Sequence, residues 1–234
     1  MEIKVLASSS AGNCYLINDG ETPLLLEAGL PFRAIQRGLG FGVAGLAACL
    51  ISHEHGDHAQ AAADIMKAGI DVFASRGTAK ALGLKGHRLG LIRSMEKLSI
   101  GTWTVTPFDV VHDAEEPLGF ILASKAGKLF FASDTAYVKY RVPGLTHIMI
   151  EVNYVAETLR ENMKKGLIHP AHYKRVLRNH MSLERAAKFL QANDLNNVQE
   201  IWALHLSDAN ADEALIQTTL QRVSGKPVYI APRG

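Results

Sequence analysis

The segment SHEHGDHA, at residues 52–59, places three histidines and one aspartate within six consecutive positions. The apolar run LAACLIS (46–52) precedes it and predicts a buried strand, whereas Ala, Ile and Met at helical spacing over 58–67 predict a helix. Imidazole and carboxylate are suitable donors for zinc, iron or manganese. A polar loop with scattered histidines is the alternative, but four donors at one strand end favour a metal site.

Alternation of side chains along an extended segment assigns the donors of this string to two groups. His53 and His55 are two positions apart, so both can point toward one ion. After the turn, Asp57 and His58 can reach a second ion nearby. Gly56 relieves crowding in that turn. The string therefore predicts part of a dinuclear centre.

Three further donors stand at or near the ends of later predicted strands. They are His112, Asp134 and His205. With the first four they make five histidines and two carboxylates, which suits two divalent ions with a bridging carboxylate and an open position for water. Such a set accepts zinc or manganese, and also iron, and availability often decides between them.

The order of the predicted elements indicates an α/β fold. Strands are expected at 3–7, 14–18, 23–28, 46–52, 70–75, 103–111, 118–124, 128–133, 146–152, 201–207 and 227–231. Helices are expected at 31–38, 58–67, 77–83, 155–192 with breaks near Gly166 and Pro170, and 211–222. Two packed sheets with helices outside fit this order. The length of 234 residues suits one domain spanning 1–234.

Composition narrows the class and the compartment. No apolar run approaches the roughly 20 residues of a membrane helix, so no membrane association is expected. The N-terminus lacks the basic and apolar segments of a signal peptide. Cys14 and Cys49 are too few for a disulfide framework. They are expected to be buried small hydrophobic residues in a cytoplasmic protein.

Positive charge is concentrated in one part of the chain. The formal net charge is only +2, but six basic residues and a single acidic one lie between Arg160 and His180. A basic patch in an otherwise mildly acidic protein suits an anionic polymer. A solvated helix face is the alternative explanation.

The pattern HxHxDH, followed by His112, Asp134 and His205, resembles that of metallo-β-lactamase-fold hydrolases over essentially the whole chain. The resemblance implies an αββα four-layer sandwich and two metal ions. It assigns one ion to His53, His55 and His112, and the other to Asp57, His58 and His205, with Asp134 as the bridge.

Other segments resemble the YycJ/WalJ branch of that superfamily more closely. They are LASSSAGNCYLI, VHDAEEPLGF, MIEVNY and NHMS. Ser9, the string SDTA, and Asn179, Met181 and Leu183 depart from the branch pattern, which places substrate preference in question. The branch implies a DNA exonuclease that cleaves phosphodiester bonds with a metal-bridging hydroxide. Two close divalent ions generate such a nucleophile at neutral pH.

Several residues around the metal ligands are expected to serve the reaction. Asp57 is expected to orient the hydroxide while binding its ion. His180 is expected to touch the scissile phosphate or protonate the departing oxygen, although packing before a helix N-cap at Ser182 is the alternative. The predicted substrate contacts are Ser10, Asn13, Asn153, Lys174 and Arg178. An ordinary tight turn explains the first two equally well.

Rival functions follow from the same metal chemistry, because the metals do not choose the substrate. The enzymatic alternatives are a small-molecule hydrolase, acting as a cyclic nucleotide phosphodiesterase, lactonase or thioesterase, and an RNA-processing nuclease. A third alternative is a protein module that binds metal and nucleic acid without catalysing a reaction. It is disfavoured because none of the expected metal ligands is missing. DNA is favoured over RNA as the partner. The sequence leaves an oligomer open.

Overall fold

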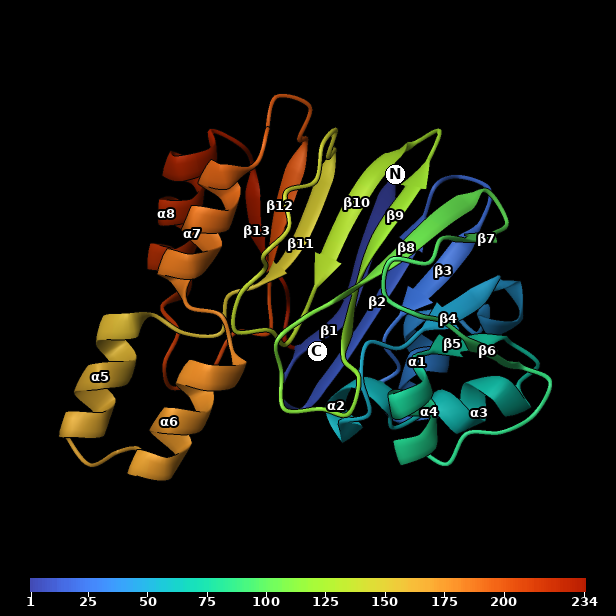
Figure 1. The fold of residues 1–234 in the computed structure, drawn as a ribbon, viewed down its shortest axis with the longest axis horizontal. Coiled ribbons are helices and arrows are strands. Elements are labelled where there is room, and N and C mark those ends of the chain that lie inside the picture. Colours follow the sequence, from blue (N-terminus) through green and yellow to red (C-terminus); the bar gives the residue numbers. More distant parts are fainter. The chain divides into compact units, whose positions relative to one another are not determined.

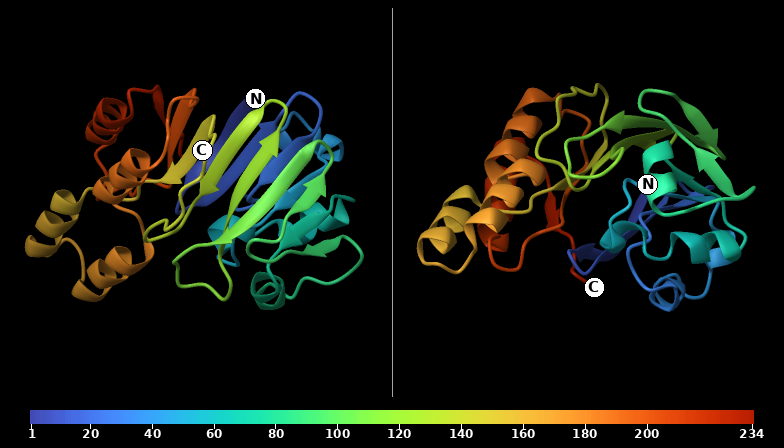
Figure 2. Two further views of the ribbon diagram at one scale, coloured as in Figure 1. Left: turned by 45° about the horizontal axis from the view of Figure 1, so that its top comes forward. Right: turned by 60° about the horizontal axis from the view of Figure 1, so that its bottom comes forward.

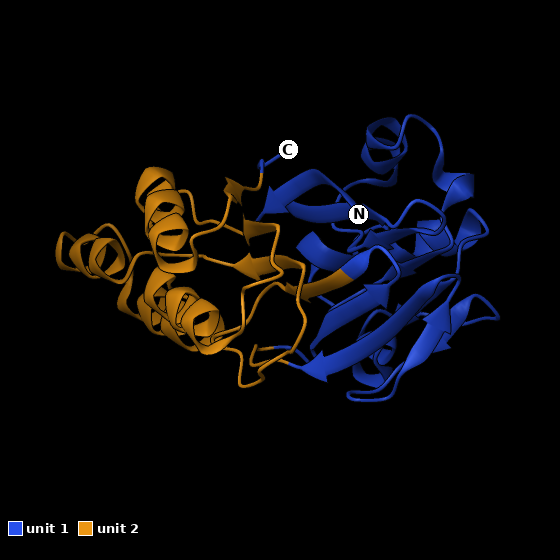
Figure 3. Ribbon diagram, turned by 90° about the horizontal axis from the view of Figure 1, so that it is seen from above, with its two compact units in different colours: residues 1–109, 114–127, 232–234 blue, residues 110–113, 128–231 orange.

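The computed structural model describes all residues, 1–234, and divides into two compact units. Unit 1 comprises residues 1–109, 114–127 and 232–234, and unit 2 comprises residues 110–113 and 128–231 (Figure 3). The predicted donors are therefore divided: the string at 53–58 belongs to unit 1, whereas His112 and the later donors belong to unit 2.

Unit 1 contains a mixed sheet whose six strands lie side by side in sequence order (Figure 1). The strands are β1 (Glu2–Ser9), β2 (Gly12–Asn18), β3 (Pro23–Leu26), β4 (Ala48–Leu50), β5 (Val72–Ala74) and β6 (Leu89–Leu91). The first two pairs are antiparallel, and β3 to β6 are parallel. Parallel strands need crossovers. Helices α1 (Phe32–Gly38), α2 (Gly56–Ala59), α3 (Ala62–Lys67) and α4 (Arg76–Ala81), with a 3₁₀ turn at Val43–Gly45, lie in these connections.

A second set of strands in unit 1 forms an antiparallel meander. It consists of β7 (Leu98–Ile100), β8 (Trp103–Asp109) and β9 (Leu118–Ser124). The indole of Trp103 is buried and donates a hydrogen bond of 2.8 Å to the carbonyl of Thr22, which ties the meander to the turn before β3. Buried aliphatic residues of β3 to β5 pack against Ile35 and Ile65 of the covering helices.

Unit 2 is built on parallel strands with helices between them (Figure 2). The strands are β10 (Gly127–Ala132), whose first residue belongs to unit 1, β11 (His147–Glu151), β12 (Glu200–Leu204) and β13 (Val228–Ile230). The helices are α5 (Ala156–Lys164), α6 (Pro170–Asn179), α7 (Leu183–Ala192) and α8 (Glu213–Ser224). Packing of Phe130 against Phe189, with ring centroids 4.8 Å apart, fixes α7 on the sheet. Parallel strands place their carboxyl ends at one edge, where residues that follow them gather.

The sequence predicted most elements, with local differences. The strand expected at 46–52 spans only Ala48–Leu50, so the HxH pair lies in the loop beyond it. The helix expected at 58–67 is two short helices. Strands β6 and β7 were missed because their sequences, LGL and LSI, lie outside any apolar run, unlike the equally short β4 and β5.

Helix boundaries in the 155–192 region agree with the predicted breaks. α5 ends before Gly166, and Pro170 occupies the first turn of α6. A further break separates α6 from α7, where the hydroxyl of Ser182 accepts a hydrogen bond from the amide of Arg185. The N-cap predicted at Ser182 is therefore confirmed.

Two expectations that came from composition can be compared with the structure. Cys14 and Cys49 are fully buried and form no disulfide, as predicted. No helix is long and apolar enough to cross a membrane. The single domain spanning 1–234 stays a prediction.

Candidate metal centre

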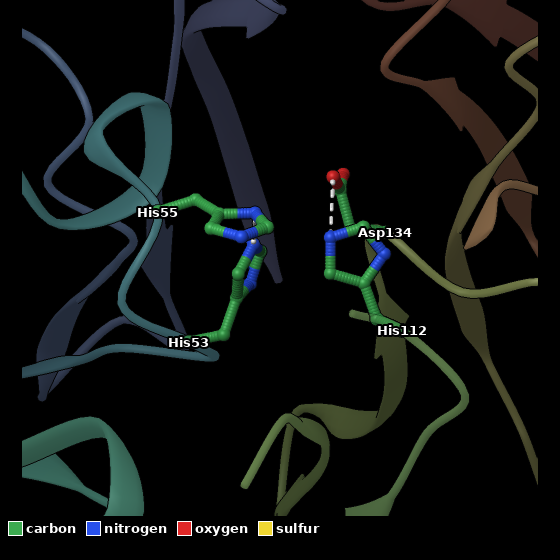
Figure 4. A group of neighbouring side chains, drawn as sticks. All are labelled: His53, His55, His112 and Asp134. Carbon is green, nitrogen blue, oxygen red and sulfur yellow. Dashed lines mark hydrogen bonds and ion pairs between the residues drawn. The ribbon is translucent and has the colours of Figure 1, made fainter. Parts of the chain in front are cut away.

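The donors of unit 1 lie in residues 53–58, the HEHGDH loop, which begins after β4 and runs into α2. Figure 4 shows His53 and His55 side by side. Nε2 of His53 lies 3.1 Å from Nδ1 of His55. The ring of His58 lies beside that of His53, with centroids 4.1 Å apart, and its Nε2 is 3.4 Å from Oδ2 of Asp57. His53 and His58 are almost fully buried. Three imidazoles and one carboxylate thus share one small volume.

Polar groups behind the loop fix the orientation of its histidines. The hydroxyl of Ser52 lies 2.8 Å from Nδ1 of His53, which leaves Nε2 for a metal. The amide of Asn13 contacts Nε2 of His58 at 3.1 Å and donates to the backbone carbonyl of Asp57 at 3.2 Å. Such outer contacts set the tautomer and direction of metal-binding histidines.

The buried carboxylate of Glu27 lies directly behind the HEHGDH loop. Its Oε2 accepts the amide of Ser52 at 3.2 Å and lies 3.7 Å from Nδ1 of His58. A carboxylate facing one imidazole nitrogen favours the other nitrogen as the metal ligand. The carboxylate of Glu27 has zero exposure, so a charge at this depth requires compensation.

A glycine permits the HEHGDH loop to approach β2. A Cβ built at Gly29 would lie only 1.7 Å from the carbonyl oxygen of Asp57. The amide of Gly29 donates to the carbonyl of Asn13 at 2.9 Å, which fixes the backbone at this close approach. The sequence PLLLEAGL shows that a glycine is present at position 29, but nothing in it predicts the contact with Asp57.

Asp134 occupies the centre of the donors in unit 2. It follows β10, is 3% exposed, and presents its two oxygens to different histidines. Oδ1 lies 3.3 Å from Nδ1 of His205, and Oδ2 lies 3.5 Å from Nε2 of His112 (Figure 4). A carboxylate that shares its oxygens in this way has the arrangement of a bridging ligand.

His112 is oriented by the backbone of α6. Its Nδ1 lies 3.0 Å from the carbonyl of Asn179, so Nδ1 carries the proton and Nε2 faces Asp134. Burial lowers the pKa of His112 below its ordinary value, although the charge of Asp134 acts against this. A neutral imidazole is the form that binds a metal.

A buried glutamate at the end of β11 holds His180. Oε1 of Glu151 lies 2.6 Å from Nδ1 of His180, and its Oε2 accepts the amides of Thr135 and Met181 at 2.8 and 3.0 Å. Burial by itself raises the pKa of Glu151, but the charge and hydrogen bond of His180 outweigh it and lower that pKa. Burial by itself lowers the pKa of His180, but the charge of Glu151 outweighs it and raises that pKa above its ordinary value.

His205 completes the donors of unit 2. The side-chain amide of Asn153 donates to the carbonyl of His205 at 2.9 Å and lies 3.3 Å from its Nδ1. One donor atom each from Asp134, Glu151, His180 and His205 lies within 4.8 Å of the others. All four stand at the carboxyl ends of β10, β11, β12 and α6.

Backbone strain accompanies these side chains. Glu27, Asp134 and His205 have φ of 64°, 33° and 52°, in the left-handed region that residues other than glycine seldom occupy. Strained residues of this kind persist only where the surrounding structure holds them, and they are enriched at functional sites.

The predicted substrate contacts differ in exposure. Ser10, Lys174 and Arg178 are exposed. Asn13 is fully buried and Asn153 is 8% exposed, and each contacts a histidine of the predicted metal-binding set. These two are therefore better suited to support than to contact with a substrate. All five contacts stay predictions.

Glu27 and Glu151 were missed as functional residues. Each is a single acid in an apolar run, LLLEAG and IMIEV. An acid in a fully buried strand is rare unless it is paired, so this was the available signal. The partners could not be named from the sequence, because they lie 25 and 29 residues away.

A family model described as "Beta-lactamase superfamily domain" matches residues 22–205. The chain belongs to this superfamily. The exodeoxyribonuclease YycJ of Bacillus anthracis is 27% identical over 241 residues, covering 95% of this chain and 89% of that protein. The exodeoxyribonuclease WalJ of Streptococcus pneumoniae is 28% identical over 234 residues, covering 92% and 85%. The predicted resemblance to the YycJ/WalJ branch is confirmed.

Solved structures show the same fold. The metallo-β-lactamase fold protein YhfI of Bacillus subtilis has a TM-score of 0.78 at 15% identity, covering 99% of this chain and 96% of that one. Zinc-bound PqqB of Methylobacterium extorquens has a TM-score of 0.72 at 14% identity, covering 100% and 98%. The predicted α/β metallo-β-lactamase class is confirmed.

Family and donor chemistry agree on the class of activity. The HEHGDH loop supplies three imidazoles and a carboxylate, and Asp134 lies between two histidines of unit 2. These donors fit divalent metal ions. The chain is a metal-dependent hydrolase of the superfamily.

Proposed function

We propose that this chain is a dinuclear metal-dependent exodeoxyribonuclease that holds two divalent ions through its histidine and aspartate donors. The observation that carries the proposal is the clustering of these donors within each unit: the HEHGDH loop in unit 1, and His112, Asp134 and His205 in unit 2. The proposal also makes residues 1–234 a single functional domain.

The arrangement around Asp134 supports two ions. Its two oxygens face different histidines, as expected of a carboxylate between two cations. One ion would take His53, His55 and His112, and the other would take Asp57, His58 and His205. Zinc or manganese, and also iron, suit these donors.

The reaction assigns separate tasks to Asp57 and His180. Bound divalent ions supply a nucleophile from water at neutral pH and stabilise negative charge on the phosphoryl group. Asp57, whose side chain is 23% exposed, orients the attacking oxygen from within the HEHGDH loop. His180 donates a proton to the departing oxygen through Nε2, because Nδ1 is held by Glu151.

Two observations support DNA as the substrate. The relatives that align with almost the whole chain are exodeoxyribonucleases. In addition, the six basic residues of segment 160–178 are all exposed on or beside α5 and α6, where they can contact phosphates. Ion pairs with Glu161 and Asp113 reduce this charge at Lys165 and Arg175. A small-molecule hydrolase or an RNA-processing nuclease is the alternative. We also propose a cytoplasmic location, which suits the two free thiols.

Metal analysis and end-labelled substrates test the proposal. Protein purified without added metal is expected to contain two ions per chain. His53→Ala in unit 1 and His112→Ala in unit 2 are each expected to reduce that number and abolish cleavage. Labelled DNA should shorten stepwise from one end. Activity confined to a chromogenic phosphodiester, or retention of both ions in both variants, would contradict it.

A further inference from the structure

A basic groove in unit 2 lies outside the metal donors and outside segment 160–180. It has a volume of about 380 Å³ and runs between the loop after Asp134 and helix α7. Its lining includes four cationic residues, Lys139, Arg141, Arg185 and Lys188, and no acidic residue. We name it the 139–188 groove.

Aromatic rings accompany these charges. Tyr137 and Tyr140 line the 139–188 groove, and Tyr137 is 49% exposed. Nζ of Lys139 lies 5.1 Å from the centre of the Tyr140 ring. Exposed aromatic rings among cations are the features by which proteins bind single-stranded nucleic acid, since bases stack on the rings while phosphates contact the cations.

The Arg185 side chain joins the two walls of the groove. The guanidinium of Arg185 donates to the carbonyls of Ala136 at 2.9 Å and Leu177 at 3.4 Å, which ties α7 to the loop. Tyr137 is three residues from Asp134, so their Cα atoms are at most about 11 Å apart. The end of the groove at Tyr137 therefore lies near Asp134.

A second hollow extends the groove along α7. Its volume is about 510 Å³, and it shares Arg185 and Lys188 with the first hollow and adds Arg160, but Glu157 and Glu184 also line it, so its positive charge is weaker. A groove of similar volume in unit 1, about 350 Å³, has a different character. Of its cations, Lys67 and Arg88 are paired with Asp64 and Asp71, Lys85 also lines it, and no Phe, Tyr or Trp does.

We propose that the 139–188 groove binds single-stranded DNA and guides it to the metal donors. This deepens the proposed function and rests on it for the reaction, but not for the binding. Binding of single-stranded DNA would account for the cations and tyrosines that follow Asp134 in the chain.

Removal of charge tests the phosphate contacts. Binding of fluorescent dT12 to the full chain is measured by anisotropy in EDTA, where no cleavage occurs. Lys139→Ala, Arg141→Ala and Lys188→Ala together are expected to weaken binding by about tenfold or more and to reduce the salt slope by about 2. Arg185 is kept because it supports the loop. Exposed Lys80, Lys97 and Lys125, changed together to Ala, are the control of equal charge. Equal losses in both variants would overturn the proposal.

Substitution of Tyr137 tests the stacking. Tyr137→Ala is expected to weaken dT12 binding by about tenfold, and Tyr137→Phe, which keeps the ring, is expected to bind like the wild type. Turnover of a small chromogenic phosphodiester should not change in either variant. Unchanged dT12 affinity in Tyr137→Ala, or no binding of dT12 by the wild type, would overturn the proposal that the groove binds single-stranded DNA.

The two proposals fail separately in these experiments. A wild-type protein that binds dT12 through the groove but cleaves no DNA in the presence of metal would contradict the exonuclease alone. Cleavage of DNA with the same KM in wild type and groove variants would contradict the groove alone.

Discussion

Oε1 of Glu151 lies 2.6 Å from Nδ1 of His180, and both side chains belong to unit 2. Two backbone amides fix the other oxygen of Glu151, so the carboxylate has little freedom. The imidazole therefore has one nitrogen committed and the other available, and its ring is 15% exposed. This pair holds a proton donor in place beside Asp134 without being part of the predicted ligand set.

Replacement of His180 is expected to impair DNA cleavage through the leaving group. His180→Ala should lower kcat on DNA by about 10²- to 10⁴-fold, because the departing oxygen loses its proton donor. A nitrophenyl phosphodiester, whose leaving group departs without protonation, should be cleaved at a nearly unchanged rate. The bound metal is measured in the wild type and in His180→Ala, and equal contents show that the substitution leaves the metal site intact. Equal losses on both substrates would contradict the acid role.

Substitution of Glu151 is expected to act through His180. Glu151→Gln keeps the shape but removes the charge that holds the imidazole, so kcat on DNA should fall by about 10- to 100-fold. The nitrophenyl substrate should again be spared. Glu157→Gln, on the surface of α5, is the control for a lost carboxylate. A Glu151→Gln protein that cleaves DNA like the wild type would show that the contact has no role in turnover.

Gly29 is expected to admit no side chain. A Cβ there would meet the carbonyl of Asp57 at 1.7 Å, so Gly29→Ala must displace the HEHGDH loop or β2. We expect loss of bound metal and a lower unfolding temperature. Gly45→Ala is the matched control, because nothing lies within 4 Å of a Cβ at that position. Metal analysis and thermal unfolding measure the two effects.

Glu27 is expected to tune the metal affinity of His58. Its carboxylate lies 3.7 Å from Nδ1 of His58, and Glu27→Gln should weaken metal binding by about 10- to 100-fold. Glu21→Gln, at an exposed position, should leave the affinity unchanged. Titration of the apoprotein with zinc against a competing chelator gives the affinities. Identical zinc affinities in wild type and Glu27→Gln would show that the contact is only structural.

The two thiols are expected to be inert in the folded chain. Burial raises the pKa of Cys14 and of Cys49 well above the ordinary value, and nearby Glu27 acts in the same direction. Because the thiolate is the reactive form, neither residue should react with a disulfide reagent from pH 7 to 9. Both should react after denaturation. Rapid reaction of the folded protein would contradict the burial of both residues.

The sequence by itself determined the elements and the types of donor. Periodicity and turn residues located most strands and helices, and the string at 53–58 predicted a metal site, since these signals lie within a few neighbouring residues. Ser182 was identified as a helix N-cap because capping depends on positions three apart. His112, Asp134 and His205 could be proposed as ligands because each closes or follows a strand.

Only the tertiary structure decided how those donors are held. Glu27, Gly29 and Glu151 act on residues 25 or more positions away, and no local pattern encodes a contact across that distance. The left-handed backbone at Asp134 and the groove beside Tyr137 likewise arise where packing brings separate segments together. Hydrophobic patterning states which face of an element is buried, but the partner that it meets is set by how all the elements pack at once.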